Sequence, residues 1–260
     1  PRGTEAPPRL SGGHQSPLAD TVVVEARVST ALYPFLEDHR LAGLTIVPAA
    51  FHLDLLAEAG KRITGEGPAV LRDVVLHQPL VLEDGEERRV QLVLSPPQEG
   101  AAPFKLIGLQ GRPSLQAPWD LIVSGRVEAP APQAAAPAPA VRRETIEKRC
   151  RRTLAVDAFY ERLHRCGYQF GPAFRGIQTL QANDREALAR IASLAAEREP
   201  VGLGAFPPPL LDACLQAGAA LWPEENRESL YLPISIDAFH LFRQPRGVLW
   251  SHAAAPDRPR

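Results

Sequence analysis

The chain has 260 residues, of which 45% are hydrophobic and 23% are charged, and its formal net charge is −1. This composition is typical of a globular protein, and a charge near zero disfavours a nucleic-acid partner or an anionic membrane surface. No apolar run reaches the ~18 residues of a membrane-spanning helix, and the Pro/Gly-rich start lacks the apolar core of a signal peptide. We therefore expect a cytoplasmic protein with no membrane segment.

The few sulfur-containing residues also bear on the class of protein. Cys150, Cys166 and Cys214 form neither a metal-binding CxxC pair nor an even disulfide set, which fits a reducing compartment. The sequence contains no methionine, and position 1 is a proline. We therefore expect this chain to be a piece of a longer polypeptide.

The first half, residues 1–128, is predicted to form antiparallel strands around one helix. The helix should begin near Pro48, because proline is favoured in a first helical turn, and should end at Gly60. Polar side chains are rare along it, which indicates that most of this helix is buried. Strands are expected at residues 21–28, 69–75, 80–82, 90–95, 104–109 and 119–127.

The second half, residues 142–260, is predicted to repeat this plan. Residues 129–141 separate the halves, and their proline and alanine content is typical of an extended, semi-stiff linker. An amphipathic helix is expected at residues 156–165 and a second buried helix at residues 209–221. Further strands are expected at residues 176–180, 187–191, 230–236 and 248–252. Two halves with one central helix each indicate a duplicated architecture.

The first segment that suggests chemistry is HRLAGLTIVP, in which His39, Gly43 and Pro48 fit the pattern HxxxGxxxxP. Glycine lets the backbone approach a ligand closely. Proline starts a helix whose free N–H groups suit a developing oxyanion. An imidazole titrates near neutral pH, so His39 is a candidate general base. The alternative interpretation is a chance histidine in a surface loop.

The second segment is GYQFGPAF, residues 167–174, which places Tyr168, Gly171 and Pro172 among aromatic residues. Alone, this composition predicts a tight turn with packed rings. A later segment, LPIS at residues 232–235, is more typical of structure than of chemistry.

The third segment places Asp212 inside an otherwise apolar helix. Burying a carboxylate without a partner is costly, and desolvation raises its pKa, which suits a general acid. Gln216 follows one helical turn later, so its amide can hold the carboxyl group. The alternative is a solvated first-turn residue that interacts favourably with the helix dipole.

In this order the four segments resemble the dehydratase domains of modular type I polyketide synthases. The family pattern is HxxxGxxxxP, GYxYGPxF, DxxxQ and LPxS, and the resemblance covers nearly the whole chain. It implies an α+β double hotdog fold, in which two antiparallel sheets each wrap around a central helix. It also implies that a histidine from the first half and an aspartate from the second half face one another across a substrate tunnel.

The resemblance implies removal of water from a 3-hydroxyacyl thioester, with His39 as base and Asp212 as acid. The substrate would be carried on the phosphopantetheine of an acyl carrier protein, and no metal or further cofactor is expected. Tyr168 and Gln216 are expected to support the acid, and a backbone N–H between positions 43 and 49 to polarise the thioester carbonyl. Other residues expected to support the substrate site are Gly43, Pro48, Gly171 and Pro172. Expected partners are the carrier protein, neighbouring synthase domains and a second copy in a homodimer.

This sequence departs from the family pattern at several positions. Phe170 stands where a tyrosine is often found, Ala49 where glycine is common, and Pro207 where a histidine often precedes the acid. His14 begins only a loose echo of the usual HPLL opening, and the chain ends soon after His252. None of these departures removes the expected catalytic pair.

Several outcomes remain compatible with the sequence. The domain can dehydrate only, or it can follow dehydration with oxa-Michael ring closure or a shift of the double bond. It can also be a catalytically silent structural module, or a hotdog thioesterase, since fold alone does not decide the reaction.

Overall fold

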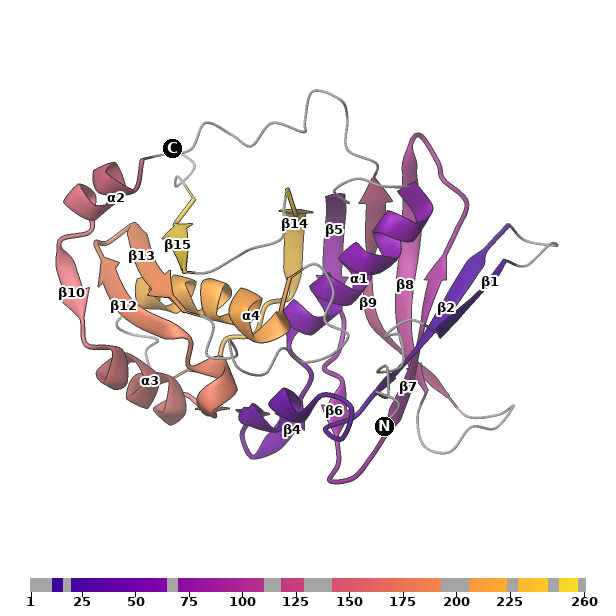
Figure 1. The fold of residues 1–260 in the computed structure, drawn as a ribbon, viewed down its shortest axis with the longest axis horizontal. Coiled ribbons are helices and arrows are strands. Elements are labelled where there is room, and N and C mark those ends of the chain that lie inside the picture. Colours follow the sequence, from indigo (N-terminus) through magenta and orange to yellow (C-terminus); the bar gives the residue numbers. More distant parts are fainter. Residues whose placement is uncertain are drawn as a thin grey trace, which may run out of the picture.

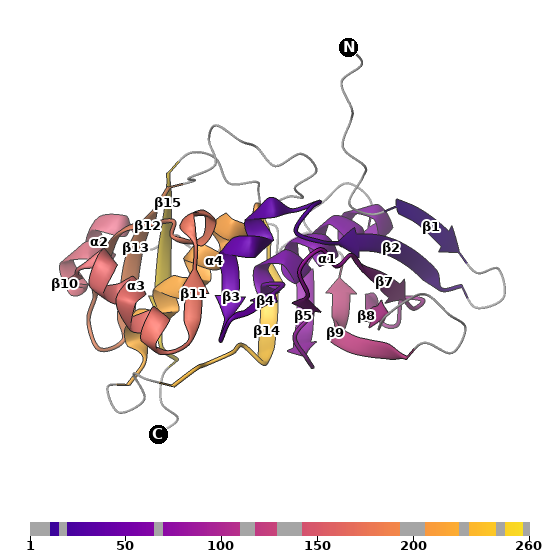
Figure 2. The ribbon, with the colours of Figure 1, turned by 90° about the horizontal axis from the view of Figure 1, so that it is seen from below.

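The computed structural model describes residues 11–15, 20–64, 70–109, 118–128, 142–192, 206–223, 229–242 and 248–256. Two buried helices, α1 (Ala49–Thr64) and α4 (Pro208–Gln216), contact one another in the middle of an elongated molecule. Antiparallel sheets lie at the two ends (Figures 1 and 2). The predicted architecture of two sheets and two central helices is confirmed. No helix in these ranges is long and apolar enough to span a bilayer.

The larger sheet packs on α1 and has the strand order β1-β2-β7-β8-β9-β5-β14. Its strands are β1 (Ser11–Gln15), β2 (Val22–Val28), β5 (Val70–Leu76), β7 (Arg88–Leu94), β8 (Ala101–Leu109), β9 (Trp119–Glu128) and β14 (Ser235–His240). Along β7 the residues Val90, Leu92 and Leu94 are buried, and the residues between them are not. This alternation is expected of a strand with one face on a core.

A second sheet packs on α4 and has the order β10-β12-β13-β15. A short helix, α2 (Arg143–Arg149), precedes it, and α3 (Val156–Arg165) covers its side. The remaining short elements are η1 (Pro34–Asp38), η2 (Pro172–Phe174) and η3 (Ala217–Leu221). The strands of this sheet are β10 (Arg152–Leu154), β12 (Ile177–Ala182), β13 (Glu186–Ile191) and β15 (Leu249–Ala254).

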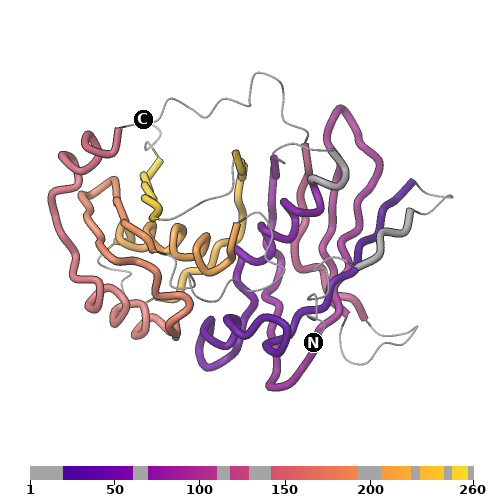
Figure 3. Tube along the Cα trace, viewed as in Figure 1, coloured from indigo at the N-terminus to yellow at the C-terminus, as the bar shows by residue number. Residues whose placement is uncertain are grey.

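Two strands of the second half pair with strands of the first half. The short sheet β11-β3-β4-β6 joins β11 (Tyr168–Phe170) to β3 (His39–Leu41), β4 (Leu44–Ile46) and β6 (Val81–Leu82), and β11 lies beside β3 in Figure 2. Likewise β14 returns from the C-terminal half to pair with β5, as the trace in Figure 3 shows. The proposed division into residues 1–128 and 142–260 therefore has strand pairs across it. The predicted linker, residues 129–141, lies outside the described residues.

A close backbone contact ties the two halves together beside this short sheet. The Gly171 N–H donates to the main-chain carbonyl of Asp38 at 2.8 Å, and the Ala173 N–H donates to the Asp38 carboxylate at 2.8 Å. A Cβ at position 171 would lie 2.2 Å from an oxygen of that carboxylate. Glycine at this position is therefore explained by the close approach of Asp38.

Three of the predicted boundaries are wrong by four or five residues. The helix predicted at residues 209–221 is α-helical only to Gln216 and continues as the 3-10 helix η3, so its last turn is more tightly wound. Helix α1 continues past Gly60 to Thr64, because Gly60 does not adopt the positive φ with which glycine ends a helix. The strand predicted at residues 230–236 begins only at Ser235. Pro233 has no N–H to give to a ladder, and the pairing with β5 begins where the Leu76 N–H donates to the Ile234 carbonyl.

We predict that Gly171→Ala destabilises the protein by about 1–3 kcal/mol, because the added methyl group must displace the Asp38 carboxylate. The matched control is Gly218→Ala in η3, where a Cβ meets nothing within 4 Å and the free energy of unfolding should not fall. Urea unfolding of both variants measures the difference. Equal stability of the two variants would contradict the role assigned to the Asp38 contact.

Candidate active site

His39 lies at the junction of η1 and β3 and is 6% exposed, so the alternative of a surface histidine is wrong. The turn that follows has positive φ at both Ala42 (49°) and Gly43 (86°), which is the geometry of a tight two-residue hairpin. This hairpin lets Leu41 pair with Leu44 and returns the chain past His39 toward α1. The Gly43 of the motif thus allows the tight turn between β3 and β4.

The histidine ring is held in one tautomer. Its Nδ1 lies 2.7 Å from the main-chain carbonyl oxygen of Ile46. A carbonyl only accepts hydrogen bonds, so Nδ1 carries a proton, and in the neutral ring the lone pair lies on Nε2. The rings of Phe170 and Phe174 lie against the imidazole, with centroid distances of 5.4 and 4.9 Å. The imidazole of His39 is therefore fixed by one hydrogen bond and by contacts with two aromatic rings.

The start of α1 lies next to this histidine. The Pro48 carbonyl accepts the first helical hydrogen bond, from the Phe51 N–H at 2.9 Å, so the predicted helix start is confirmed. The N–H groups of Ala49 and Ala50 have no acceptor among the described residues. The Gly43 N–H, in contrast, donates to Gln169 Oε1 at 2.9 Å. Within residues 43–49, where an N–H that polarises the thioester carbonyl is predicted, the N–H of Gly43 is therefore already used and that of Ala49 is not.

Prolines and one buried carboxylate position α4. Pro207 precedes the helix, its carbonyl accepts the first helical hydrogen bonds, and Pro208 and Pro209 have no N–H that would need a partner. The N–H of Phe206 donates to Asp54 Oδ1 on α1 at 2.9 Å. Asp54 is fully buried in an apolar helix, and this contact supplies a hydrogen-bond donor to its carboxylate. The same contact joins the two central helices.

Asp212 lies in the second turn of α4 and is 9% exposed, so the alternative of a solvated first-turn residue is wrong. Gln216 Nε2 donates both to Asp212 Oδ2 at 2.8 Å and to the Phe174 carbonyl at 2.9 Å. Because the Phe174 carbonyl only accepts, the NH₂ end of the Gln216 amide must face these two oxygens. Asp212 Oδ1 has no hydrogen-bond partner among the described residues.

The environment of Asp212 favours its protonated form. Burial raises the pKa of the Asp212 carboxyl above its ordinary value, whereas a positive charge on His39 and the hydrogen bond from Gln216 act in the opposite direction. Phe174 links the two side chains, which come from different halves of the chain, because its ring packs on His39 and its carbonyl accepts from the Gln216 amide that also donates to Asp212. The structure therefore brings together the candidate base and the candidate acid.

The segment GYQFGPAF joins the two candidates. Pro172 begins the turn η2, which brings Phe174 between them. The Phe174 ring packs on His39, and its carbonyl accepts from Gln216. The Tyr168 hydroxyl donates to the Tyr231 carbonyl. Burial raises the pKa of Tyr168 to about 12, and a negative charge on Asp212 is among the other influences that raise it, so the role of Tyr168 beside the acid stays a prediction.

Sequence reasoning missed Tyr160. This residue of α3 is buried, and its hydroxyl donates to Gln216 Oε1 at 3.1 Å. The amphipathic pattern of α3 marks Tyr160 as an inward-facing position, but it gives no sign that the hydroxyl reaches another helix.

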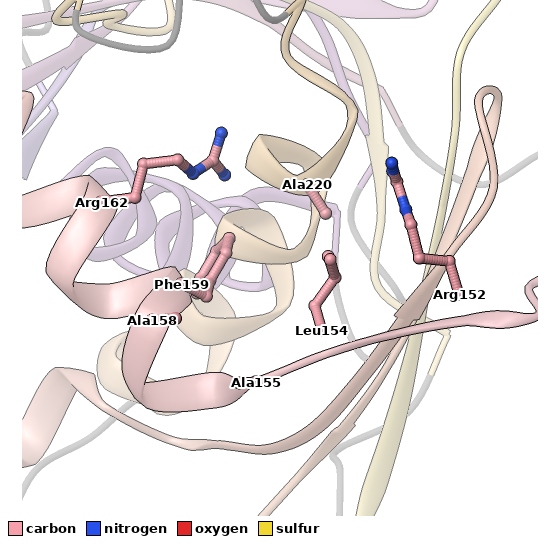
Figure 4. A pocket seen from close by; sticks show the side chains of 7 residues that line it. All are labelled: Arg152, Leu154, Ala155, Ala158, Phe159, Arg162 and Ala220. Atoms are coloured by element: carbon pink, nitrogen blue, oxygen red, sulfur yellow. The ribbon is translucent and has the colours of Figure 1, made fainter.

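A separate pocket of about 160 Å³ lies between β10, α3 and η3 (Figure 4). Its lining includes Leu154, Phe159 and Ala220, and the guanidinium groups of Arg152 and Arg162 flank it. Neither candidate catalytic residue lines this pocket. In the described ranges, no group of three or more His, Cys, Asp or Glu side chains is arranged to hold a metal ion.

The arrangement of two sheets on two central helices is that of double hotdog proteins. The family profile described as polyketide synthase dehydratase domain matches residues 9–108. The profile described as polyketide synthase dehydratase N-terminal domain matches residues 138–257. Together they match most of the chain. The chain belongs to the dehydratase family of modular polyketide synthases.

Similar proteins agree with this assignment. The chain is 30% identical to mycoketide-CoA synthase of Mycobacterium tuberculosis and 28% identical to polyketide synthase GfsE of Streptomyces halstedii. These alignments cover 84% and 86% of this chain but only 5% and 6% of the two relatives. Among solved structures, the dehydratase domain from the CurF module of curacin polyketide synthase has a TM-score of 0.86 at 23% identity, covering 98% of this chain and 90% of that one.

We predict that Asp212→Asn gains stability relative to the parent as the pH rises. A carboxyl whose pKa is raised by folding contributes stability below its unfolded pKa, and that contribution is lost as the pH passes the folded value. The asparagine variant has no such loss and can still accept a hydrogen bond from Gln216. Urea unfolding of both proteins between pH 4 and about 8 measures the difference.

The control for the loss of one carboxyl is Asp237→Asn, an exposed position on β14. A difference between the parent and Asp212→Asn that stays constant over the whole pH range would contradict the raised pKa of Asp212.

Proposed function

We propose that this domain removes water from a 3-hydroxyacyl thioester to give the α,β-unsaturated thioester during polyketide chain elongation. One observation carries the proposal. It is that a buried imidazole, whose Nδ1–H is held by a main-chain carbonyl so that the neutral ring has its lone pair on Nε2, lies near a buried carboxyl whose pKa is raised by burial. These are the protonation states that a base and an acid need before the reaction begins.

His39 is proposed to take the α proton of the substrate at Nε2. The Ile46 carbonyl holds the Nδ1–H and stabilises the imidazolium that forms. The packed rings of Phe170 and Phe174 limit rotation of the imidazole, so Nε2 keeps one direction.

Asp212 is proposed to give its proton to the leaving β-hydroxyl, which departs as water. Oδ2 accepts a hydrogen bond from Gln216, so the proton belongs on Oδ1. The positive charge that His39 gains lowers the pKa of Asp212 at the moment when the carboxyl must release its proton. Each transfer thus favours the other, and a proton passing from the imidazolium to the carboxylate would restore both groups.

The start of α1 is proposed to polarise the thioester carbonyl as the enolate develops. The Ala49 N–H is the first of the helix, and the positive end of the helix dipole lies there. Pro48 starts this helix, while Gly171 and Pro172 shape the wall next to His39. These residues are proposed to support the substrate site.

The substrate is proposed to arrive on the phosphopantetheine of an acyl carrier protein, with no further cofactor. The carrier protein, the neighbouring synthase domains and a second copy in a homodimer are the proposed partners, and the cytoplasm is the proposed location. The dehydratase domain from the CurJ module of curacin polyketide synthase, 25% identical to this chain, is inactive when one of its histidines is replaced by phenylalanine. That result supports a histidine as an essential group.

We predict that His39→Ala and Asp212→Asn each lower the rate of dehydration by roughly 10²–10⁴-fold, because each removes one proton-transfer group. The assay incubates the domain with 3-hydroxyacyl pantetheine thioesters and follows loss of water by mass spectrometry. Matched controls are His164→Ala on the exposed side of α3 and Asp237→Asn on β14, which should keep the parental rate.

Three outcomes separate the alternatives. Loss of water with a new conjugated alkene supports simple dehydration. Loss of water without that alkene, using a substrate with a distal hydroxyl, indicates ring closure or migration of the double bond. A folded parent that leaves every β-hydroxyl diastereomer unchanged would contradict the proposed function and indicate a silent module.

A further inference from the structure

Among the described residues, Tyr160 supplies the one hydroxyl that is hydrogen-bonded to the Gln216 amide, which holds the candidate acid. It lies on α3, two turns before the strand β11, and is 6% exposed. Its oxygen accepts from the Ile177 N–H at 3.2 Å, and its proton is directed to Gln216 Oε1 at 3.1 Å. Because Ile177 is a donor, the single hydroxyl proton has no other direction to take along this chain.

The hydrogen bonds around Asp212 therefore run in one direction. They begin at the Ile177 N–H, pass through Tyr160 and the Gln216 amide, and end at Asp212 Oδ2. If the Gln216 amide were turned over, its oxygen would face the Phe174 carbonyl and its NH₂ group would face the Tyr160 hydroxyl. Tyr160 and Phe174 thus select the same orientation of Gln216 from opposite ends.

We propose that Tyr160 is a positioning residue for the acid: it fixes the Gln216 amide so that Asp212 Oδ2 is always the hydrogen-bonded oxygen and Oδ1 carries the catalytic proton. This inference rests on the function proposed above. Hydrogen bonds in series polarise one another, so the Tyr160 hydroxyl also strengthens the bond from Gln216 to the carboxylate that forms when the proton leaves.

The alternative role for Tyr160 is packing alone. Its ring lies in the second core, and the guanidinium of Arg175 lies 4.8 Å from the ring centroid. Burial raises the pKa of Tyr160 to about 12, so the hydroxyl keeps its proton throughout the working pH range. Phenylalanine would keep the ring and the Arg175 contact, and would remove only the hydroxyl. The two roles can therefore be separated.

Other groups near Asp212 must be considered in any pH profile. The charge of His39, on β3, acts on Asp212. The charge of Asp212 in turn acts on three groups, which are Tyr160 on α3, Tyr168 on β11 and Cys214 on α4. Only the hydrogen bond from Gln216 depends on Tyr160. A change at Tyr160 should thus act on the pH profile through the carboxyl of Asp212.

We predict that Tyr160→Phe lowers kcat about 3- to 10-fold and leaves KM unchanged, the effect of losing one buried hydrogen bond at the acid. The limb of the pH profile that reports deprotonation of the acid should move to higher pH, because the Gln216 amide is no longer polarised by the phenol and becomes a weaker donor to the carboxylate. The control is Tyr231→Phe, which removes a phenol that is outside this chain of hydrogen bonds and should match the parent.

A double-mutant cycle with Gln216→Ala tests the route of the effect. If Tyr160 acts through Gln216, Tyr160→Phe has no further effect on kcat in the Gln216→Ala background. Full additivity of the two changes would overturn the proposal and leave a packing role.

A second variant covers the case in which Tyr160→Phe does not fold. A fluorinated tyrosine at position 160 keeps the ring and makes the O–H a stronger donor, so the same limb should move to lower pH. A shift to higher pH, or none, would overturn the proposal. If the parent itself removes no water, the proposed function fails; if the parent depends on Asp212 but Tyr160→Phe matches Tyr231→Phe, only this inference fails.

Discussion

The pairing of β11 with β3 is the constraint on which the rest of the site depends. It places Phe170 opposite His39 in a main-chain ladder, so the position of the histidine relative to the second half is set by backbone hydrogen bonds. The contact of Asp38 with Gly171 continues this junction and starts the turn that brings Phe174 inward. Phe174 thus connects the two candidates, because its ring contacts His39 and its carbonyl accepts a hydrogen bond from Gln216, which also donates to Asp212.

Two buried carboxyl groups lie on the central helices, and their hydrogen bonds differ in kind. Asp54 accepts a main-chain N–H and serves to join the helices. Asp212 Oδ2 accepts a hydrogen bond from the side-chain amide of Gln216, which is itself held by Tyr160 and Phe174. Asp212 Oδ1 has no partner among the described residues. The first contact joins the two central helices, and the second leaves one oxygen of the candidate acid without a partner in the described part of the chain.

The sequence predicts the parts of this site that depend on local spacing. Gln216 reaches Asp212 because residues four apart share a helix face, and α1 begins after Pro48 because proline suits a first turn. Contacts between distant segments could not be predicted in this way. The partner of Tyr168 is a carbonyl more than sixty residues further along the chain, and the contact of Tyr160 depends on how α3 packs on α4. The end of α1 was missed because a buried glycine can stay helical when packing favours it.

The pairing of β14 with β5 has a consequence for how the protein is made. During synthesis the N-terminal end emerges first, and every other strand of the larger sheet is complete long before residues 235–240 leave the ribosome. Until then β5 is an open edge with unpaired main-chain groups, which is the kind of surface that joins with other nascent chains. The late strand β14 thus covers the edge of β5, and a chain interrupted before residue 235 would leave the main-chain groups of β5 unpaired on that side.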